Sequence, residues 1–261
     1  MATKNQYQLN KEIESFIRDK DSRKETYSQA DIEFIRQYEG SGGQGSKGAT
    51  GEGILYEFFT PPYIVDLMWQ LAYRYGFDES GTVLEPSIAT GRLIEPSPDK
   101  SKCVGFEINP ISARIAEITY PGATIHRGYF ETAFMQQERF TRRLPPNQIT
   151  WLKEYPFSLI IGNPPYGKYK NKYSSYFPNP KMPQIEQFFM YYGLQLLKPG
   201  GLLIYLTSSN FLRNGITYNK AKDEIGKFAE LLDAYRLPPV FRFSEVPTDI
   251  LIFKRKQYGN K

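Results

Sequence analysis

The chain has 261 residues, of which 40% are hydrophobic, and its 33 basic and 28 acidic side chains give a net charge of +5. This length fits one α/β domain with an N-terminal extension, and no apolar stretch approaches the ~20 residues of a membrane span. Cys103 and His126 are the only residues of their kinds, which excludes an internal disulfide, a histidine-based metal site and a Ser-His triad. Residues 1–11 are polar, so we expect no signal peptide. The composition therefore predicts a cytoplasmic protein with no membrane and no metal among its partners, and its positive charge favours a polyanion.

The N-terminal region predicts helix followed by a segment without regular structure. Residues 9–38 carry two apolar stripes, which indicate one or two helices. Residues 39–53 are crowded with glycine and small polar side chains, a composition typical of a hinge over a ligand or of a plain linker. We therefore expect residues 1–53 to form a helical extension with a hinge, and residues 54–261 to form the main, catalytic domain.

From residue 63 onward, helical and strand patterns alternate. Helices are expected at 63–75, 112–119, 184–197 and 221–232, and strands at 82–84, 103–107, 123–126, 157–162 and 202–206. Residues 240–243 and 250–253 predict a final pair of strands. This alternation is typical of a doubly wound, mainly parallel sheet with helices on both faces, a Rossmann-like α/β fold. In such a fold the ligand site lies at the carboxyl ends of the strands.

The most informative stretch is Asn163-Pro164-Pro165-Tyr166, directly after the apolar run 157–161. Because proline fixes φ and has no N–H donor, the Asn163 side-chain oxygen and the Pro164 carbonyl are expected to remain free as acceptors beside the Tyr166 ring. Two acceptors on the hydrogens of a planar amine or amide would localise the nitrogen lone pair, which prepares the nitrogen to attack a methyl group. A strand followed by an ordinary Pro-Pro turn is the competing interpretation.

Two acidic residues follow short apolar strands upstream of this motif. Glu85 stands at the head of the small-residue turn 85–91, and Glu107 ends the strand 103–107. The interval between them is close to the one that dinucleotide-type folds use for a ribose-binding carboxylate. The order of turn, acid and Asn-Pro-Pro-Tyr therefore indicates an S-adenosylmethionine site next to a methyl acceptor.

These motifs resemble those of the amino-directed DNA methyltransferases that act on adenine N6. The segments that carry the resemblance, in family order, are Glu57–Pro62, Glu85–Gly91, Phe106–Pro110, Asn163–Tyr166 and Leu197–Leu206. The likeness covers residues 38–255. Finer details resemble the methylase part of large phage and mobile-element proteins that fuse methylase and helicase-like modules; they lie at residues 120–123, 128–131, 236–238 and 248–250.

The resemblance implies a role for each residue at a matching position. The catalytic loop would be Asn163, Pro164, Pro165 and Tyr166. The cofactor S-adenosylmethionine would be bound by Thr60, Pro61, Glu85, Pro86, Ser87, Ala89, Gly91, Glu107, Ile108, Glu131 and Asn163. The chain departs from the family pattern at Ala89, where the family usually has glycine, and at Tyr129, where an aspartate commonly holds the adenine amino group of the cofactor. Glu131 is the candidate to replace that aspartate.

Basic and aromatic residues alternate directly after the catalytic motif. Residues 168–181 contain four lysines and no acid, and the residues expected to contact nucleic acid are Lys168, Tyr169, Lys170, Lys172 and Tyr173. Lysines follow phosphates, and aromatic rings fill the gap that a base leaves when it is pulled from the stack. A solvated basic loop is the alternative.

The sequence thus predicts an S-adenosylmethionine-dependent methyltransferase, prokaryotic or phage-encoded and of restriction-modification type, that modifies the N6 of an adenine flipped out of double-stranded DNA. Three alternatives stay open: an RNA methyltransferase, a protein-glutamine methyltransferase, and a catalytically degenerate nucleic-acid-binding subunit. The chain ends about a dozen residues after Asp249, so we expect little or no target-recognition domain. Sequence recognition would then come from short loops or from a separate specificity or helicase subunit.

Overall fold

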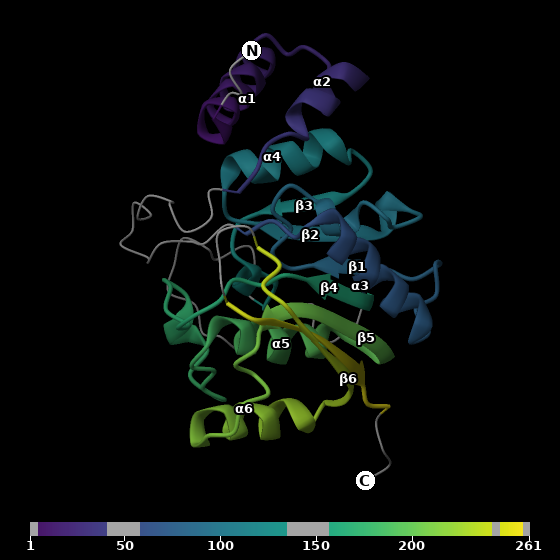
Figure 1. Ribbon diagram of the computed structural model, residues 1–261, viewed down its shortest axis with the longest axis vertical. Coiled ribbons are helices and arrows are strands. Elements are labelled where there is room, and N and C mark those ends of the chain that lie inside the picture. Colours follow the sequence, from purple (N-terminus) through teal and green to yellow (C-terminus); the bar gives the residue numbers. More distant parts are fainter. Residues whose placement is uncertain (1–4, 41–57, 135–156, 242–245, 258–261) are drawn as a thin grey trace.

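A seven-stranded sheet with the order β3-β2-β1-β4-β5-β7-β6 forms the centre of the computed structural model (Figure 1). The structure describes residues 5–40, 58–134, 157–241 and 246–257. The strands are β1 (Val83–Glu85), β2 (Cys103–Glu107), β3 (Thr124–Arg127), β4 (Phe157–Gly162), β5 (Leu197–Ser208), β6 (Ala229–Leu237) and β7 (Thr248–Arg255). Neighbouring strands are parallel from β3 to β5, and β7 runs antiparallel to both β5 and β6. The predicted mainly parallel α/β sheet is confirmed.

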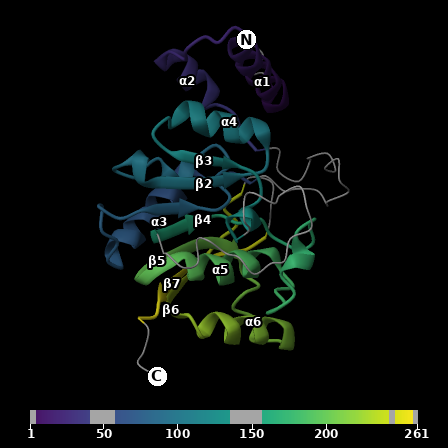
Figure 2. The same ribbon diagram turned by 180° about the vertical axis from the view of Figure 1, so that it is seen from behind.

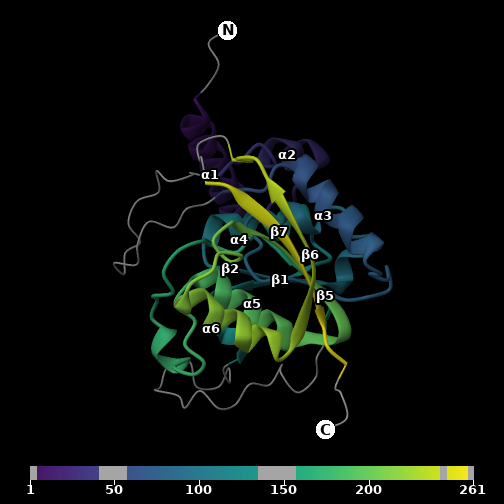
Figure 3. The ribbon, with the colours of Figure 1, turned by 60° about the horizontal axis from the view of Figure 1, so that its bottom comes forward.

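Helices cover both faces of this sheet. The described α-helices are α1 (Gln6–Ser22), α2 (Gln29–Ile35), α3 (Pro62–Arg74), α4 (Pro110–Thr119), α5 (Ile185–Leu196) and α6 (Ile216–Gly226). Figure 3 shows α3 on one side of the sheet and α5 and α6 on the other. Alternating side chains of β5 explain this layering, because Leu203 and Tyr205 pack with α5 and α6 while Leu202 and Ile204 pack with α3. The central strands β1, β4, β5 and β7 are therefore buried on both faces, as strands of parallel sheets are.

The N-terminal residues form two helices, α1 and α2, that pack beyond α4 at one end of the molecule (Figure 2). Ile13, Ile17 and Ile35 are buried against Ile115 and Ile118 of α4. The predicted helical character of this region is confirmed. The predicted hinge falls largely on residues 41–53, outside the described residues, and the division of the chain at residue 53 stays a prediction.

The carboxyl-terminal hairpin differs from its prediction. The helix expected over 221–232 ends at Gly226, and residues 229–237 form strand β6. The first strand of the expected pair, at 240–243, is wrong as far as it is described: Val240 and Phe241 lie outside any strand, residues 242–243 lie outside the described residues, and the partner of β7 is β6. Residues 229–234 contain good helix formers, but pairing along β7 offers them a complete hydrogen-bond ladder, so tertiary context overrides local propensity.

Two kinds of feature are absent from the described residues. No helix among them combines the length and the apolar character that crossing a bilayer requires. Nor do three or more His, Cys, Asp or Glu side chains gather within the described ranges as a metal-binding group.

Candidate active site

A cavity of about 850 Å³ opens at the carboxyl ends of β1, β2 and β4. The strand order reverses between β1 and β4, and a doubly wound sheet binds its ligands at such a reversal. The lining comes from residues 58–60, 85–90, 92–93, 106–108, 128–131, 163–168, 170–172, 185 and 189. The predicted cofactor and catalytic segments are thus brought together in one cavity, although 105 residues separate Phe58 from Asn163.

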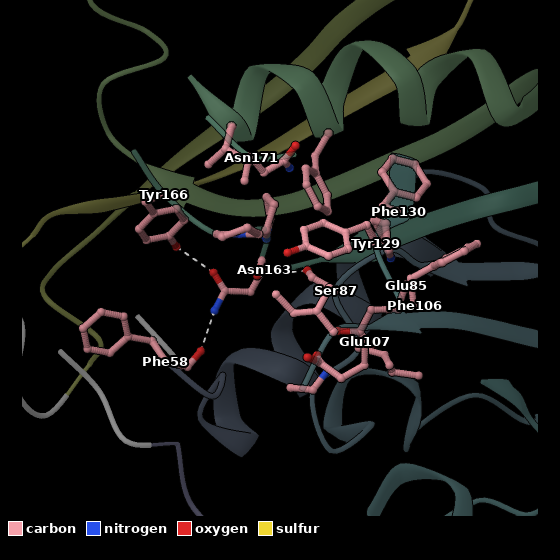
Figure 4. Close-up of a pocket in the computed structure, with 18 of the residues that line it drawn as sticks. Phe58, Glu85, Ser87, Phe106, Glu107, Tyr129, Phe130, Asn163, Tyr166 and Asn171 are labelled. Atoms are coloured by element: carbon pink, nitrogen blue, oxygen red, sulfur yellow. Dashed lines mark hydrogen bonds between the residues drawn. The ribbon is translucent and has the colours of Figure 1, made fainter. Parts of the chain in front are cut away.

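The side-chain amide of Asn163 is held at both ends (Figure 4). Its Nδ2 donates to the carbonyl oxygen of Phe58 at 2.9 Å, and its Oδ1 accepts a hydrogen bond from the Tyr166 hydroxyl at 2.7 Å. The Asn163 oxygen was expected to be free of protein partners, and the structure instead gives it one. A carbonyl oxygen accepts two hydrogen bonds, so Oδ1 keeps a second lone pair for a ligand.

Tyr166 is turned inward beside this amide. Its ring packs against the core cluster that contains α3, and burial, followed by the charge of Glu186, raises the pKa of its hydroxyl. The hydroxyl therefore stays protonated and acts as a donor to Asn163, with a second, longer contact of 3.5 Å to the carbonyl oxygen of Leu206. The ring is thereby held beside Asn163, Pro164 and Pro165 in the wall of the cavity.

Glu186, in the first turn of α5, is hydrogen-bonded to the residue that follows the predicted catalytic loop 163–166. Its side chain is 3% exposed; Oε2 accepts from the backbone N–H of Gly167 at 3.2 Å, and Oε1 accepts from the Ser208 hydroxyl at 3.3 Å. Burial raises the pKa of the Glu186 carboxyl. The backbone of Ile185 donates back to the Gly167 carbonyl at 2.8 Å. Sequence reasoning missed this residue, and the only signal for it was an acid at the start of an otherwise apolar helix.

Glu107, at the end of β2, joins two turns of the cavity wall. Its Oε2 accepts from the backbone N–H of Ala89 at 2.8 Å, and its Oε1 accepts from the backbone N–H of Asn109 at 2.7 Å. The turn after β1 is tight, because Ala89 has φ of 48° and Gly91 has φ of 87°. Both values lie in the left-handed region, where glycine is the favoured residue. The glycine that the family usually has at position 89 is thus explained by backbone conformation.

Glu85, at the end of β1, is a second acidic residue of the cavity wall and is deeply buried. It is 2% exposed, and its Oε2 has no hydrogen-bond partner among the described residues. Burial, and after it the charge of Glu107, raises the pKa of Glu85 well above its ordinary value. Burying a polar atom without a hydrogen-bond partner costs free energy. A ligand that donates a hydrogen bond to this oxygen would therefore be stabilised in the cavity.

The segment after the catalytic loop is divided between buried rings and exposed lysines. Lys168, Lys170 and Lys172 are exposed and line the cavity. Tyr169 is turned into the protein, where its ring stacks on Phe188 with a centroid distance of 4.3 Å. Tyr173 likewise packs edge-on against Tyr129 at 5.3 Å. Both rings are half-buried and pack against the core cluster that contains α5. Their contact with nucleic acid stays a prediction.

Glu131 lies in the short 3-10 helix Phe130–Phe134 after β3 and is 1% exposed. Its Oε1 accepts hydrogen bonds from the Tyr169 hydroxyl, at 3.1 Å, and from the Asn171 side-chain amide. Tyr129 lies in the cavity close to Phe130 (Figure 4). Sequence reasoning did not identify Asn171, whose importance depends on this contact with a residue 40 positions away.

The remaining predicted residues lie around the same cavity. Its walls include Thr60, Pro86, Ser87, Ile108, Pro164 and Pro165. Pro61 stands just outside them as the N-cap of α3, and Gly91 closes the turn after β1. Sequence reasoning gave no role to Phe58, whose carbonyl oxygen is the partner of Asn163.

The comparisons with known proteins agree with this architecture. The family model described as "Eco57I restriction-modification methylase" matches residues 101–241, more than half of the chain. Over 206 residues the chain is 27% identical to Defense against restriction protein B of Escherichia phage P1, which covers 79% of this chain and 8% of that protein. It is 30% identical over 112 residues to the type II methyltransferase M.CvrRI of Paramecium bursaria Chlorella virus XZ-6E, covering 42% of this chain and 24% of that protein. The chain thus spans only a small part of the curated relatives it matches.

Among solved structures, a putative class I S-adenosylmethionine-dependent methyltransferase from Listeria monocytogenes superimposes with a TM-score of 0.61 at 15% identity, covering 78% of this chain and 62% of that one. This likeness establishes the class I methyltransferase fold. The cavity lies where that fold places its ligands, and the motifs that line it fall partly within the matched residues 101–241. The chain belongs to the Eco57I restriction-modification methylase family.

Proposed function

We propose that this protein is an S-adenosylmethionine-dependent DNA methyltransferase that acts on the N6 amino group of a flipped-out adenine. The observation that carries the proposal is the fixed amide of Asn163 at the wall of the cavity. Membership of a restriction-modification methylase family supports a methyl transfer reaction on DNA. The N6 position of adenine and the extrusion of the base are the parts that belong to the proposal alone.

The cavity residues fit the methyl donor of this fold class. The unpartnered Oε2 of Glu85 is an acceptor suited to the α-ammonium group of S-adenosylmethionine. Glu107 stands at the position of a ribose-binding carboxylate, and Phe106, Ile108 and Phe130 offer apolar surface to an adenine ring. When bound there, the cofactor supplies a methyl group made electrophilic by its sulfonium centre.

The acceptor would be held by the catalytic loop. Asn163 Oδ1 has a second lone pair and the Pro164 carbonyl belongs to the same wall, so together they would accept both hydrogens of an exocyclic amino group. This contact localises the nitrogen lone pair, which in free adenine is delocalised into the ring. The Phe58 carbonyl keeps the Asn163 amide in the orientation that presents its oxygen and not its nitrogen.

Positioning would account for most of the rate acceleration. The methylated ammonium that forms is strongly acidic and loses a proton to water, so the loop needs no strong general base. Flipping the adenine costs a few kcal/mol of stacking and pairing. The exposed Lys168, Lys170 and Lys172 at the cavity are suited to hold the phosphates on either side of the extruded base.

The alternative functions differ in the molecule that would accept the methyl group, or in having none. An RNA methyltransferase would use the same cavity and the same lysines. A protein-glutamine methyltransferase would use the same amide but has less need of three lysines beside it. A degenerate subunit draws on Ala89, whose methyl group sits in a strained turn, and on Tyr129 in the place of an aspartate.

Methyl transfer assays in parallel separate these functions. The protein is incubated with S-adenosylmethionine labelled in its methyl group and with duplex DNA, structured RNA or a glutamine-containing protein lysate. We expect label on DNA only. Label mainly on RNA or on protein would replace the proposal with the corresponding alternative, and bound cofactor without transfer to any of the three would favour the degenerate subunit.

A further inference from the structure

Glu131 connects the cofactor side of the cavity to the lysines on its acceptor side. It follows β3 and lines the cavity, and its carboxylate is almost fully buried. Two of the groups that donate hydrogen bonds to it, the Tyr169 hydroxyl and the Asn171 side-chain amide, belong to the segment that directly follows the catalytic loop. We call this three-residue contact the Glu131 latch and residues 168–173 the lysine segment.

Further contacts support the latch along the lysine segment. Asn171 accepts a hydrogen bond from the backbone N–H of Tyr173 at 2.9 Å, which tightens the turn. The Lys172 ammonium lies 4.7 Å above the centre of the Tyr129 ring, a cation–π contact inside the cavity. Tyr169 and Asn171 are thus held against Glu131, whereas Lys168 and Lys170 are exposed and Lys172, also exposed, lies over the Tyr129 ring.

The hydrogen bonds of the latch hold the lysine segment firmly, because their acceptor is a buried carboxylate. Burial, followed by the charge of Glu131, raises the pKa of the Tyr169 hydroxyl, which stays protonated and can only donate to the carboxylate. Hydrogen bonds to a charged group are the stronger kind, and losing one leaves the buried carboxylate underpaired. The position of the lysines thus depends on a residue of the cofactor pocket.

We propose that Glu131 is a positioning residue that fixes the lysine segment, so that a ligand in the cavity and a polyanion on the lysines each strengthen the binding of the other. The cavity wall that a cofactor would touch includes Glu131, Tyr129, Asn171 and Lys172. A ligand that restrains these groups also restrains the lysines, and such coupling is reciprocal by thermodynamic necessity. The identities of the two ligands rest on the proposed function, whereas the latch itself does not.

Limited trypsin digestion tests the latch without any catalysis. Trypsin cleaves after Lys168, Lys170 and Lys172, and cleavage of a folded protein follows the population of the locally opened segment. Tyr169→Phe removes one donor and keeps the ring on Phe188, and combining it with Asn171→Ala removes both donors. We expect cleavage at these three bonds, followed by mass spectrometry, to be about tenfold faster or more in the double variant.

Three further variants define the comparison. Tyr176→Phe removes a hydroxyl from the same loop that makes no hydrogen bond within the described residues, and it should be cut at the wild-type rate. Glu131→Gln keeps an acceptor oxygen of the same shape, so it should restore much of the protection that Glu131→Ala loses. Equal cleavage rates in the wild type and the Tyr169→Phe/Asn171→Ala variant, both with native circular dichroism, would overturn the latch.

Binding of a labelled DNA duplex, with and without S-adenosylhomocysteine, tests the coupling. S-adenosylhomocysteine, the product that the cofactor leaves after methyl transfer, should tighten DNA binding by the wild type severalfold and should slow trypsin cleavage of its lysine segment. In the Tyr169→Phe/Asn171→Ala variant both effects should fall to nearly none. An undiminished effect in that variant would refute the coupling. A wild-type protein that transfers no methyl group to DNA would refute the proposed function instead, and the trypsin comparison would still decide the latch.

Discussion

The side-chain nitrogen of Asn163 donates to the carbonyl oxygen of Phe58 across 2.9 Å. A side-chain amide has a nitrogen that donates hydrogen bonds and an oxygen that accepts them. Because this bond holds the nitrogen on Phe58, the oxygen is the end that can face a ligand in the cavity. The bond also joins the segment before α3 to the loop after β4, two elements 105 residues apart in the chain. The orientation of the Asn163 side chain therefore depends on a backbone carbonyl from the segment before α3.

Tyr166→Phe tests the other end of that amide. The variant keeps the ring and loses the hydroxyl that donates to Asn163 at 2.7 Å. A neutral hydrogen bond is worth about 0.5–1.5 kcal/mol, so kcat should fall roughly 2- to 13-fold. The affinity for S-adenosylhomocysteine, measured by calorimetry, should stay at the wild-type value. A variant with wild-type kcat would show that the hydroxyl does not help to position Asn163.

Ala89→Gly should stabilise the protein. Ala89 has φ of 48°, and the left-handed conformation costs a non-glycine residue about 1–2 kcal/mol. Glycine relieves that strain but costs about 0.5–1 kcal/mol, because it adds conformational entropy to the unfolded chain, so the net gain is up to about 1.5 kcal/mol. Urea denaturation measures it. Ala113→Gly within α4 is the matched control and should destabilise, because its backbone is helical. A clear loss of stability in Ala89→Gly would mean that the turn has adapted to alanine.

The free energy of unfolding should depend on pH through the protonation of Glu85. Burial, then the charge of Glu107, raises the pKa of this carboxyl well above its ordinary value of 4.5. The folded protein therefore holds the proton more tightly than the unfolded chain. The stability contributed by the group is fully present below pH 4.5 and is lost as the pH rises through the raised pKa.

Glu85→Gln removes this titration without changing the shape of the side chain. The stability of the wild type relative to the variant should accordingly fall as the pH is raised from about 4.5 to about 7. Urea denaturation of both proteins over this range provides the comparison. A difference that stays constant with pH would show that Glu85 is not held in a raised-pKa environment.

Neutralising Lys168, Lys170 and Lys172 to glutamine should weaken binding to every DNA sequence alike. Each phosphate contact contributes about 0.9 to the slope of log K against log salt, so three lost contacts should reduce the slope by nearly three. Stability should change little, because the three side chains are exposed. Lys198→Gln is the control: this lysine is exposed at the start of β5, away from the carboxyl ends that bear the cavity. An unchanged slope in the triple variant would remove these lysines from the interface.

Much of the cavity could be predicted because its residues are tied to strand ends. Glu85, Glu107 and Asn163 each follow an apolar strand, and parallel strands bring their carboxyl ends to one edge of the sheet. The alternation of helical and strand patterns predicted that sheet. The departure from the family glycine at Ala89 was also visible in the sequence, whereas the left-handed backbone that explains it is seen only in the structure.

The contacts that complete the cavity could not be predicted in this way. The Glu186 and Glu131 hydrogen bonds join residues whose proximity depends on how α5 and the lysine segment pack against the sheet. The inward direction of Tyr169 depends on the Phe188 ring beneath it. The first four residues of β6, 229–232, were predicted as helix, because their strand conformation depends on pairing with β7, which local propensity does not show. In each case a tertiary neighbour outweighs the local pattern.

Identification of the methylated nucleoside tests the central claim most directly. The wild type and Asn163→Ala are incubated with duplex DNA and methyl-labelled S-adenosylmethionine, and the DNA is digested to nucleosides. We predict that the wild type places the label in N6-methyl-2′-deoxyadenosine. Asn163→Ala should lose about 10²–10³ in rate, the usual effect of removing one preorganised polar contact to the reacting group, while its affinity for S-adenosylhomocysteine stays nearly unchanged. Label in any other nucleoside, or wild-type turnover by Asn163→Ala, would contradict the proposed reaction.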